Sequence, residues 1–276
     1  MSATNTPTKS VQVDGTPFPY RELGDGNGVP LVLLHHVTAV LDDWDPAVLD
    51  GLATERRVIA VDLRGVGRSG GTTPDNFEAM ADDVAAFLDA LGLDKVDLLG
   101  FSLGGIVAQV TTLRYPDRVR RIVLAGTTPA NLEGPAGMGA VLQEAIGKAG
   151  AEGRHPKHHL FFEQHPAGQA DAFLNRLNQR TDEDRDAPIS NEAVGAQLTA
   201  LAKWEQSNTS EDLAAVQQPA LVVNGDNDAM WPAASTVRLA ELLPNAKLSI
   251  YPDSGHGALF QYHEVFVQQV LDFLRG

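Results

Sequence analysis

The chain has 276 residues, of which 43% are hydrophobic, and a formal net charge of −15 at pH 7. This length is near the upper size of a single domain and supplies ample apolar side chains for one large core. The acidic balance argues against nucleic acid or an anionic membrane as a partner, because both are bound through a basic face. The absence of cysteine excludes disulfides, a thiol nucleophile and a cysteine-ligated metal.

Targeting signals are also absent from the sequence. Residues 1–9 lack the apolar region of a secretory signal, and no stretch approaches the ~18 apolar residues of a membrane span. These features predict a soluble, cytoplasmic protein, and they leave the oligomeric state open.

The first elements in chain order are strands. Residues 11–23 alternate in period two around Asp14-Gly15, which predicts an antiparallel hairpin at a sheet edge. Apolar runs then alternate with helical segments, which indicates a parallel sheet covered on both faces. The runs are Leu31–Leu34, Val58–Val61, Val96–Leu99 and Ile122–Ala125. An amphipathic helix is predicted to start near Thr73, with Thr73 as the N-cap before Pro74.

The strand-helix alternation fails over residues 131–216. This segment contains three helix-like pieces separated by charged and Gly/Pro-bearing loops, namely Gly139–Lys148, Gln169–Arg180 and Asn191–Gln206. The interpretation is an α/β core formed by residues 1–130 and 217–276, with residues 131–216 inserted as a helical cap. A cap in this position would lie over the carboxyl ends of the strands, where open α/β sheets bind ligands.

The insertion also contains His155, His158 and His159. A metal site is one interpretation of this cluster, but no acidic partner recurs at ligand spacing. A solvated loop is therefore expected, and no metal is predicted.

The most informative motif is Gly100-Phe101-Ser102-Leu103-Gly104, a G-x-S-x-G sequence between a predicted strand and a predicted helix. In a nucleophile elbow the serine occupies a strained turn, and small residues are needed beside it. The Leu103 amide would then point to where an oxyanion develops. The alternative is a Gly/Ser-rich βα turn without chemistry.

Two downstream loops favour the catalytic interpretation. Asp226 and Asp228 follow the strand-like run Leu221–Asn224, and His256 follows Leu248–Tyr251. Serine, acid and histidine therefore occur in this order, each after a strand. This is the order of an α/β-hydrolase triad, and the chymotrypsin and subtilisin orders differ from it.

With these motifs, the Asp62–Ser69 loop and the Leu31–His35 strand end, the chain resembles the α/β-hydrolase superfamily over nearly its whole length. This loop and this strand end are familiar in its esterase-like and cofactor-free haloperoxidase-like members. The resemblance implies that Asp228, followed by Met230 and Pro232, is the triad acid. Asp226 is then expected to bond its own turn, and Asp253 to be a turn acid.

One loop departs from the family pattern. Related enzymes usually have His-Gly-aromatic after the third strand, whereas His36 stands here where glycine is expected. The second oxyanion amide is assigned to Val37. The His36 side chain could narrow the pocket, donate a hydrogen bond or fill space. Trp231, beside the acid, could line the pocket or pack in the core.

Gly65–Gly70 spells G-x-G-x-x-G after a strand, so a dinucleotide site must be considered. Its glycines do not open a helix, and no strand-end acid follows about twenty residues later. A structural loop is expected instead, and no cofactor is predicted.

Together these observations predict a serine hydrolase that cleaves a small-molecule ester or lactone. Ser102 would be the nucleophile, His256 the base and Asp228 its orienting acid, with the Val37 and Leu103 amides holding the oxyanion. Carbon-carbon bond hydrolysis and perhydrolysis with the same triad remain alternatives. A ligand receptor on a hydrolase scaffold is the alternative from another class.

Overall fold

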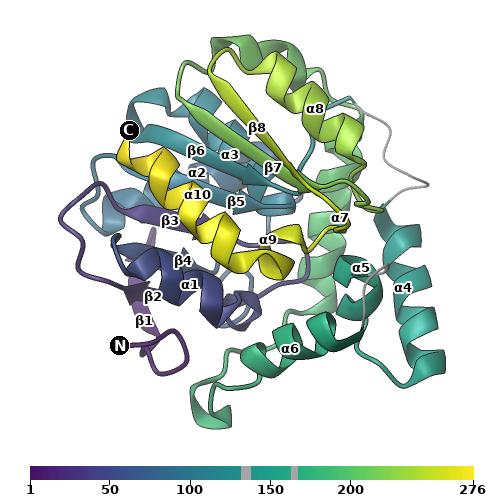
Figure 1. The fold of residues 1–276 in the computed structure, drawn as a ribbon. Helices are drawn as coiled ribbons and strands as arrows, with labels where there is room; N and C mark the ends of the chain where they lie inside the picture. Colours follow the sequence, from purple (N-terminus) through teal and green to yellow (C-terminus); the bar gives the residue numbers. More distant parts are fainter. Residues whose placement is uncertain (132–137, 163–166) are drawn as a thin grey trace.

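The computed structural model describes residues 1–131, 138–162 and 167–276, and within these residues eight strands form one sheet in the order β1-β2-β4-β3-β5-β6-β7-β8 (Figure 1). The strands are β1 (Lys9–Val13), β2 (Thr16–Leu23), β3 (Leu31–Leu34), β4 (Val58–Val61), β5 (Val96–Phe101), β6 (Val119–Ala125), β7 (Ala220–Gly225) and β8 (Ala246–Tyr251). All pairs among β3 to β8 are parallel. The α/β interpretation is confirmed.

The predicted amino-terminal hairpin is also confirmed. β1 and β2 pair antiparallel, with Val13 opposite Thr16. The turn residues Asp14 and Gly15 have φ of 48° and 76°, the left-handed conformation that a two-residue type I′ turn requires. β2 pairs antiparallel with β4, so the hairpin extends the parallel sheet at one edge.

Helices cover both faces of the sheet, and the described residues form two hydrophobic cores. Leu31 and Leu33 of β3 belong to one core, and Val32 and Leu34 to the other, because successive side chains of a strand point to opposite faces. The first core is completed by α1 (Pro46–Ala53), α9 (Ala258–Gln261) and α10 (His263–Arg275), and the second by α2 (Phe77–Ala90), α3 (Leu103–Arg114) and α8 (Ala233–Leu242). Burial on both faces explains the continuous apolar runs of the strands.

The start of α2 differs from the prediction. The helix begins at Phe77, and its N-cap is Asn76, whose side chain accepts the Ala79 N–H at 2.9 Å. The expected cap at Thr73 is wrong. An N-cap must reach an N–H two or three residues further along the helix, and Asn76 occupies that position.

Between β6 and β7 lie α4 (Met138–Glu152), α5 (Lys157–Phe162), α6 (Ala167–Leu177) and α7 (Asn191–Glu205), called here the helical insertion. Figure 1 shows α4, α5 and α6 together at one end of the sheet, where α5 and α6 contact α9. The loop expected around His158 and His159 is wrong, because these residues lie in α5. The helix is anchored by the buried rings of Phe161 and Phe162, a tertiary contact that local periodicity does not show.

No helix among the described residues is both long enough and apolar enough to cross a membrane.

Candidate active site

Ser102 occupies the turn between β5 and α3, with φ 56° and ψ −117°. A non-glycine residue rarely adopts positive φ, so this turn is strained. A hydrogen bond of 2.8 Å from the Ser102 N–H to the Ala125 carbonyl holds it in place. A Cβ on Gly104 would lie 2.0 Å from the Leu34 carbonyl oxygen, so only glycine fits where α3 approaches β3. The structure thus has the strand-turn-helix geometry that the G-x-S-x-G motif predicts.

Asp228 and His256 lie on the loops after β7 and β8, and both are buried. His256 Nδ1 is 2.8 Å from Asp228 Oδ2. Asp228 Oδ1 accepts the N–H groups of Met230 at 2.8 Å and Trp231 at 3.0 Å. Because a carboxylate only accepts hydrogen bonds, His256 carries a proton on Nδ1, and in the neutral ring Nε2 is then the nitrogen that can accept a proton.

Ser102 and His256 line the same cavity. His256 Nε2 is buried and has no hydrogen-bond partner, so the Ser102–His256 hydrogen bond is not formed in this structure. Such bonds are often loose without substrate and tighten in the reacting complex. The cavity therefore holds a serine hydroxyl and an imidazole nitrogen without a partner, the two groups that nucleophilic acyl transfer requires.

The other two candidate acids do not bond His256 Nδ1, which is paired with Asp228. Asp226 is exposed, and its carboxylate accepts the N–H groups of Asp253 and Ser254 at 3.1 Å each. Asp253 has φ 46° and is a turn residue. Asp226 thus holds the turn that leads to His256, in addition to contacting its own neighbour Asn227.

The two residues assigned to the oxyanion amides lie near the elbow. Leu103 is the first residue of α3, where backbone N–H groups have no partner within the helix. Val37 lines the cavity, and the next residue, Thr38, has φ 68°. The Thr38 N–H donates to Gln197 Oε1 of α7 at 2.9 Å, so the helical insertion holds this strained loop. Sequence reasoning missed Thr38 and Gln197, and no local signal connects them.

His36 is buried and lines the cavity. Its Nδ1 is 2.7 Å from the Val37 carbonyl, which only accepts, so Nδ1 carries the proton. Burial, reinforced by Lys157, lowers the pKa of His36 to about 3, so the ring is neutral. Its Nε2 is therefore an acceptor and has no hydrogen-bond partner, which is the wrong character for stabilising an oxyanion.

His35 precedes it and belongs to a buried polar group with Asp62. His35 Nε2 lies 3.0 Å from Asp62 Oδ1, and burial lowers the pKa of His35 to about 4. Burial and the neighbouring Asp186 carboxyl raise the pKa of Asp62. Asp186 also accepts the Arg68 N–H at 3.0 Å. The Gly65–Gly70 loop closes on itself with a bond from the Gly65 N–H to the Gly70 carbonyl, and it does not open a helix.

The cavity at Ser102 has a volume of about 450 Å³, within the range of small-molecule sites. The helical insertion supplies much of its wall. Apolar lining residues include Leu142, Ile146, Leu160, Phe161, Leu198 and Met230, and polar ones include Thr38, Asp43, Gln143, His155 and Lys157.

Trp231 does not line this cavity, so its interpretation as a pocket residue is wrong. Its side chain is 1% exposed and packs in a hydrophobic core. The preceding residue, Met230, lines the cavity instead. The two backbone N–H bonds to Asp228 fix this loop, so that Met230 reaches the cavity while the Trp231 ring packs in the core.

Phe161 of α5 is a site residue that sequence reasoning missed. Its ring centroid lies 5.2 Å from that of His36, 5.7 Å from that of Phe101 and 5.8 Å from that of His256. Its carbonyl accepts the Gly257 N–H at 3.2 Å. One residue of the insertion thus contacts both His36 and His256.

The three histidines of the insertion have different neighbours. His158 is 3.1 Å from Asp171, His159 is 3.2 Å from Glu152, and His155 lines the cavity. The expectation of a solvated position is wrong for His158, which is buried. Among the residues that the structure describes, no group of three or more His, Cys, Asp or Glu side chains could hold a metal ion.

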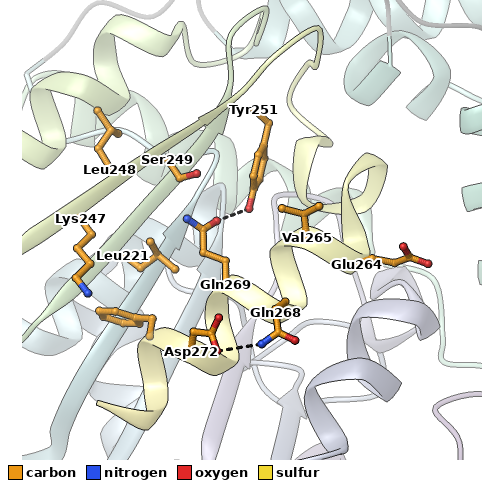
Figure 2. A pocket seen from close by; sticks show the side chains of 11 residues that line it. Leu221, Lys247, Leu248, Ser249, Tyr251, Glu264, Val265, Gln268, Gln269 and Asp272 are labelled. Carbon is orange, nitrogen blue, oxygen red and sulfur yellow. Dashed lines mark hydrogen bonds between the residues drawn. The ribbon is translucent and has the colours of Figure 1, made fainter.

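Another depression, of about 800 Å³, lies between β8 and α10 (Figure 2). Tyr251 donates to Gln269 there at 2.6 Å, and Leu248 and Val265 are 43% and 55% exposed. It is larger than the cavity at Ser102, but it contains none of Ser102, Asp228 and His256. It is therefore not the candidate active site.

The chain is similar in sequence and in fold to known proteins. An alpha/beta hydrolase fold family model matches residues 29–261. An alpha/beta hydrolase fold protein from Chitinophaga pinensis is 39% identical, with a TM-score of 0.90 and 99% of each chain covered. The non-heme chloroperoxidase of Streptomyces lividans is 31% identical over 273 residues, which are 95% of this chain and 98% of that protein. A thermophilic esterase from Thermogutta terrifontis is 26% identical, with a TM-score of 0.73 and coverage of 97% and 98%. Because the family model spans most of the chain and the Streptomyces relative aligns over nearly its whole length, the chain belongs to the alpha/beta hydrolase fold family.

Proposed function

We propose that the protein is a serine hydrolase that cleaves a carboxylic ester or a lactone through an acyl-enzyme. The observation that carries the proposal is the juxtaposition at one cavity of Ser102, at positive φ, and His256, bonded to Asp228. The likeness to an esterase supports the choice of an ester.

In the proposed reaction, Ser102 Oγ attacks the carbonyl carbon while His256 Nε2 accepts the hydroxyl proton. Asp228 holds the imidazole in the tautomer that leaves Nε2 free and stabilises the imidazolium that forms. The backbone amides of Val37 and Leu103 donate to the oxyanion. His256 then protonates the leaving alkoxide, and water, activated by the same nitrogen, releases the acid.

Residues 131–216 act in this proposal as a cap that shapes the substrate cavity. The support is that α4, α5 and α7 contribute lining residues beside Ser102. Substrate choice would then depend mainly on the insertion, and the chemistry on the sheet.

The test is covalent labelling with a fluorophosphonate probe, followed by turnover assays. Labelling should occur at Ser102, and Ser102→Ala should abolish it and reduce kcat on the order of 10⁴ to 10⁶-fold. Ser235→Ala is the matched control, because Ser235 is another buried serine but lies in α8. Labelling that persists in Ser102→Ala would remove the nucleophile assignment.

The substrate panel should contain p-nitrophenyl esters of rising acyl length, lactones and a diketone. Many product molecules per chain would support an enzyme, whereas a single turnover with a retained adduct would indicate a receptor. The likeness to a chloroperoxidase favours one further candidate, perhydrolysis, in which hydrogen peroxide replaces water at the acyl-enzyme. Peracid formation from an ester and peroxide, lost in Ser102→Ala, would identify it.

A further inference from the structure

An ion pair lies in the wall of the candidate substrate cavity. Lys157 of α5 and Asp43 of the short helix η1 (Leu41–Asp43) both line it, and Lys157 Nζ is bonded to Asp43 Oδ1. The two side chains are only 11% and 22% exposed. Asp43 Oδ2 accepts the Val40 N–H at 2.9 Å, so both carboxylate oxygens are engaged.

Apart from three histidines, the described lining residues include no other ionisable side chain that is charged near neutral pH. Burial lowers the pKa of His36 to about 3 and also lowers the pKa of His155. Lys157 and Asp43 are the only Lys, Arg, Asp or Glu residues among the described lining residues, and their formal charges cancel. Residues 132–137 and 163–166, which lie outside the described part, contain no Lys or Arg.

The charges of Lys157 and Asp43 cancel over the working pH range. Burial opposes ionisation of Asp43, but the Lys157 ammonium outweighs it and holds the pKa of Asp43 at about 2. Asp43 therefore stays ionised, and Lys157 is not available to a second carboxylate. A substrate carboxylate entering this cavity would be a partly buried charge without a counterion, which disfavours its binding.

We propose that the cavity selects uncharged substrates, and that the Lys157–Asp43 pair enforces this selection by keeping Lys157 from binding a substrate carboxylate. The inference rests on the proposed ester hydrolysis and narrows it to neutral esters or lactones with apolar acyl groups.

A purely structural role is the competing explanation. The pair joins α5 of the insertion to the core, so its loss could loosen the cap and change activity without any effect of charge. Two substitutions separate these explanations. Asp43→Asn and Lys157→Met both break the ion pair, but the first leaves a free cation in the cavity and the second leaves a free anion.

The assay compares two esters of matched shape. One is the mono-p-nitrophenyl ester of adipic acid, and the other carries an isopropyl group in place of the free carboxylate. The unmodified protein should favour the neutral ester in kcat/KM by roughly tenfold or more. Asp43→Asn should reduce this ratio by about tenfold, and Lys157→Met should increase it by a similar factor.

The control is Arg176→Gln. Arg176 of α6 pairs with Asp45 at 2.6 Å, so this variant also breaks an insertion-to-core ion pair, yet neither residue lines the cavity. Its ratio should stay at the unmodified value. Asp43→Asn and Lys157→Met ratios that shift in the same direction, or an unmodified protein that prefers the anionic ester, would overturn the inference.

Calorimetric titration of the Ser102→Ala protein with the same two esters measures the discrimination without turnover. Absence of hydrolysis of every ester by the unmodified protein would refute the proposed function. Tighter binding of the anionic ester would refute the charge selection alone.

Discussion

Gly126 is the position at which a single methyl group should disturb the candidate triad most directly. It follows β6, has φ 51° and lies beside His256. A Cβ there would be 3.2 Å from both Cε1 and Nδ1 of His256 and 3.0 Å from Cε2 of Phe101. These contacts are shorter than ordinary van der Waals separations, so Gly126→Ala must move one of the two rings by a few tenths of an ångström.

The expected effects follow from this geometry. Placing alanine in the left-handed region costs about 1–2 kcal/mol of the free energy of unfolding, and the close contacts should add to that. Misplacing a reacting group by 1 Å can cost about 10²-fold in rate, so a smaller displacement of His256 should lower kcat by about tenfold.

Gly92→Ala is the matched control, because Gly92 has φ 66° but a Cβ there would meet nothing within 4 Å. Urea unfolding should show destabilisation of both variants, whereas steady-state kinetics on a p-nitrophenyl ester should show a kcat loss only in Gly126→Ala. Equal kcat values in the two variants would refute the argument that Gly126 positions His256.

The remaining predictions concern polar residues at the site. Asp228→Asn should lower kcat by about 10³ to 10⁴-fold, whereas Asp226→Asn should lower it far less, because Asp226 only holds a turn. Steady-state kinetics that give the reverse ranking would assign the role of triad acid to Asp226. His36→Gly should preserve kcat on short esters and admit bulkier acyl groups, shifting the discrimination between short and long esters by about 1–3 kcal/mol. A loss of kcat of roughly 10² to 10³-fold on short and long esters alike would instead make His36 an oxyanion donor. Asp62, whose folded-state pKa is raised by burial and Asp186, contributes stability that is present at low pH and lost as the pH rises through that raised pKa. Asp62→Asn retains an acceptor for His35 but removes the charge. Its free energy of unfolding in urea should therefore fall less than that of the unmodified protein between mildly acidic and mildly alkaline pH. An identical pH dependence of the unfolding free energy in the two proteins would contradict this reasoning.

The sequence by itself determined the sheet and the elbow. A strand buried on both faces must be apolar at every position, so runs such as Val58–Val61 can be recognised as strands without knowing which strands lie beside them. The positive φ of Ser102 and the glycine needed where α3 crosses β3 both fall within five consecutive residues, so the elbow can be recognised from the sequence. The chain order of serine, acid and histidine follows from the same strand-loop alternation.

Tertiary structure alone decided which side chains meet at the cavity. Asp226 and Asp228 are two residues apart on the loop after β7, and the path of this loop brings Asp228 to His256. The path of the same loop places Met230 at the cavity and the Trp231 ring in the core. The bond between Gln197 and Thr38 joins residues 159 positions apart.

The protonation state of the histidines was likewise beyond the sequence. His36 is neutral because packing removes it from water and sets it against the Val37 carbonyl. The cancellation of charge between Asp43 and Lys157 depends on the docking of α5 against the core. Local spacing encodes backbone conformation and burial, whereas desolvation and charge pairing depend on distances between distant segments, which exist only once the chain has folded.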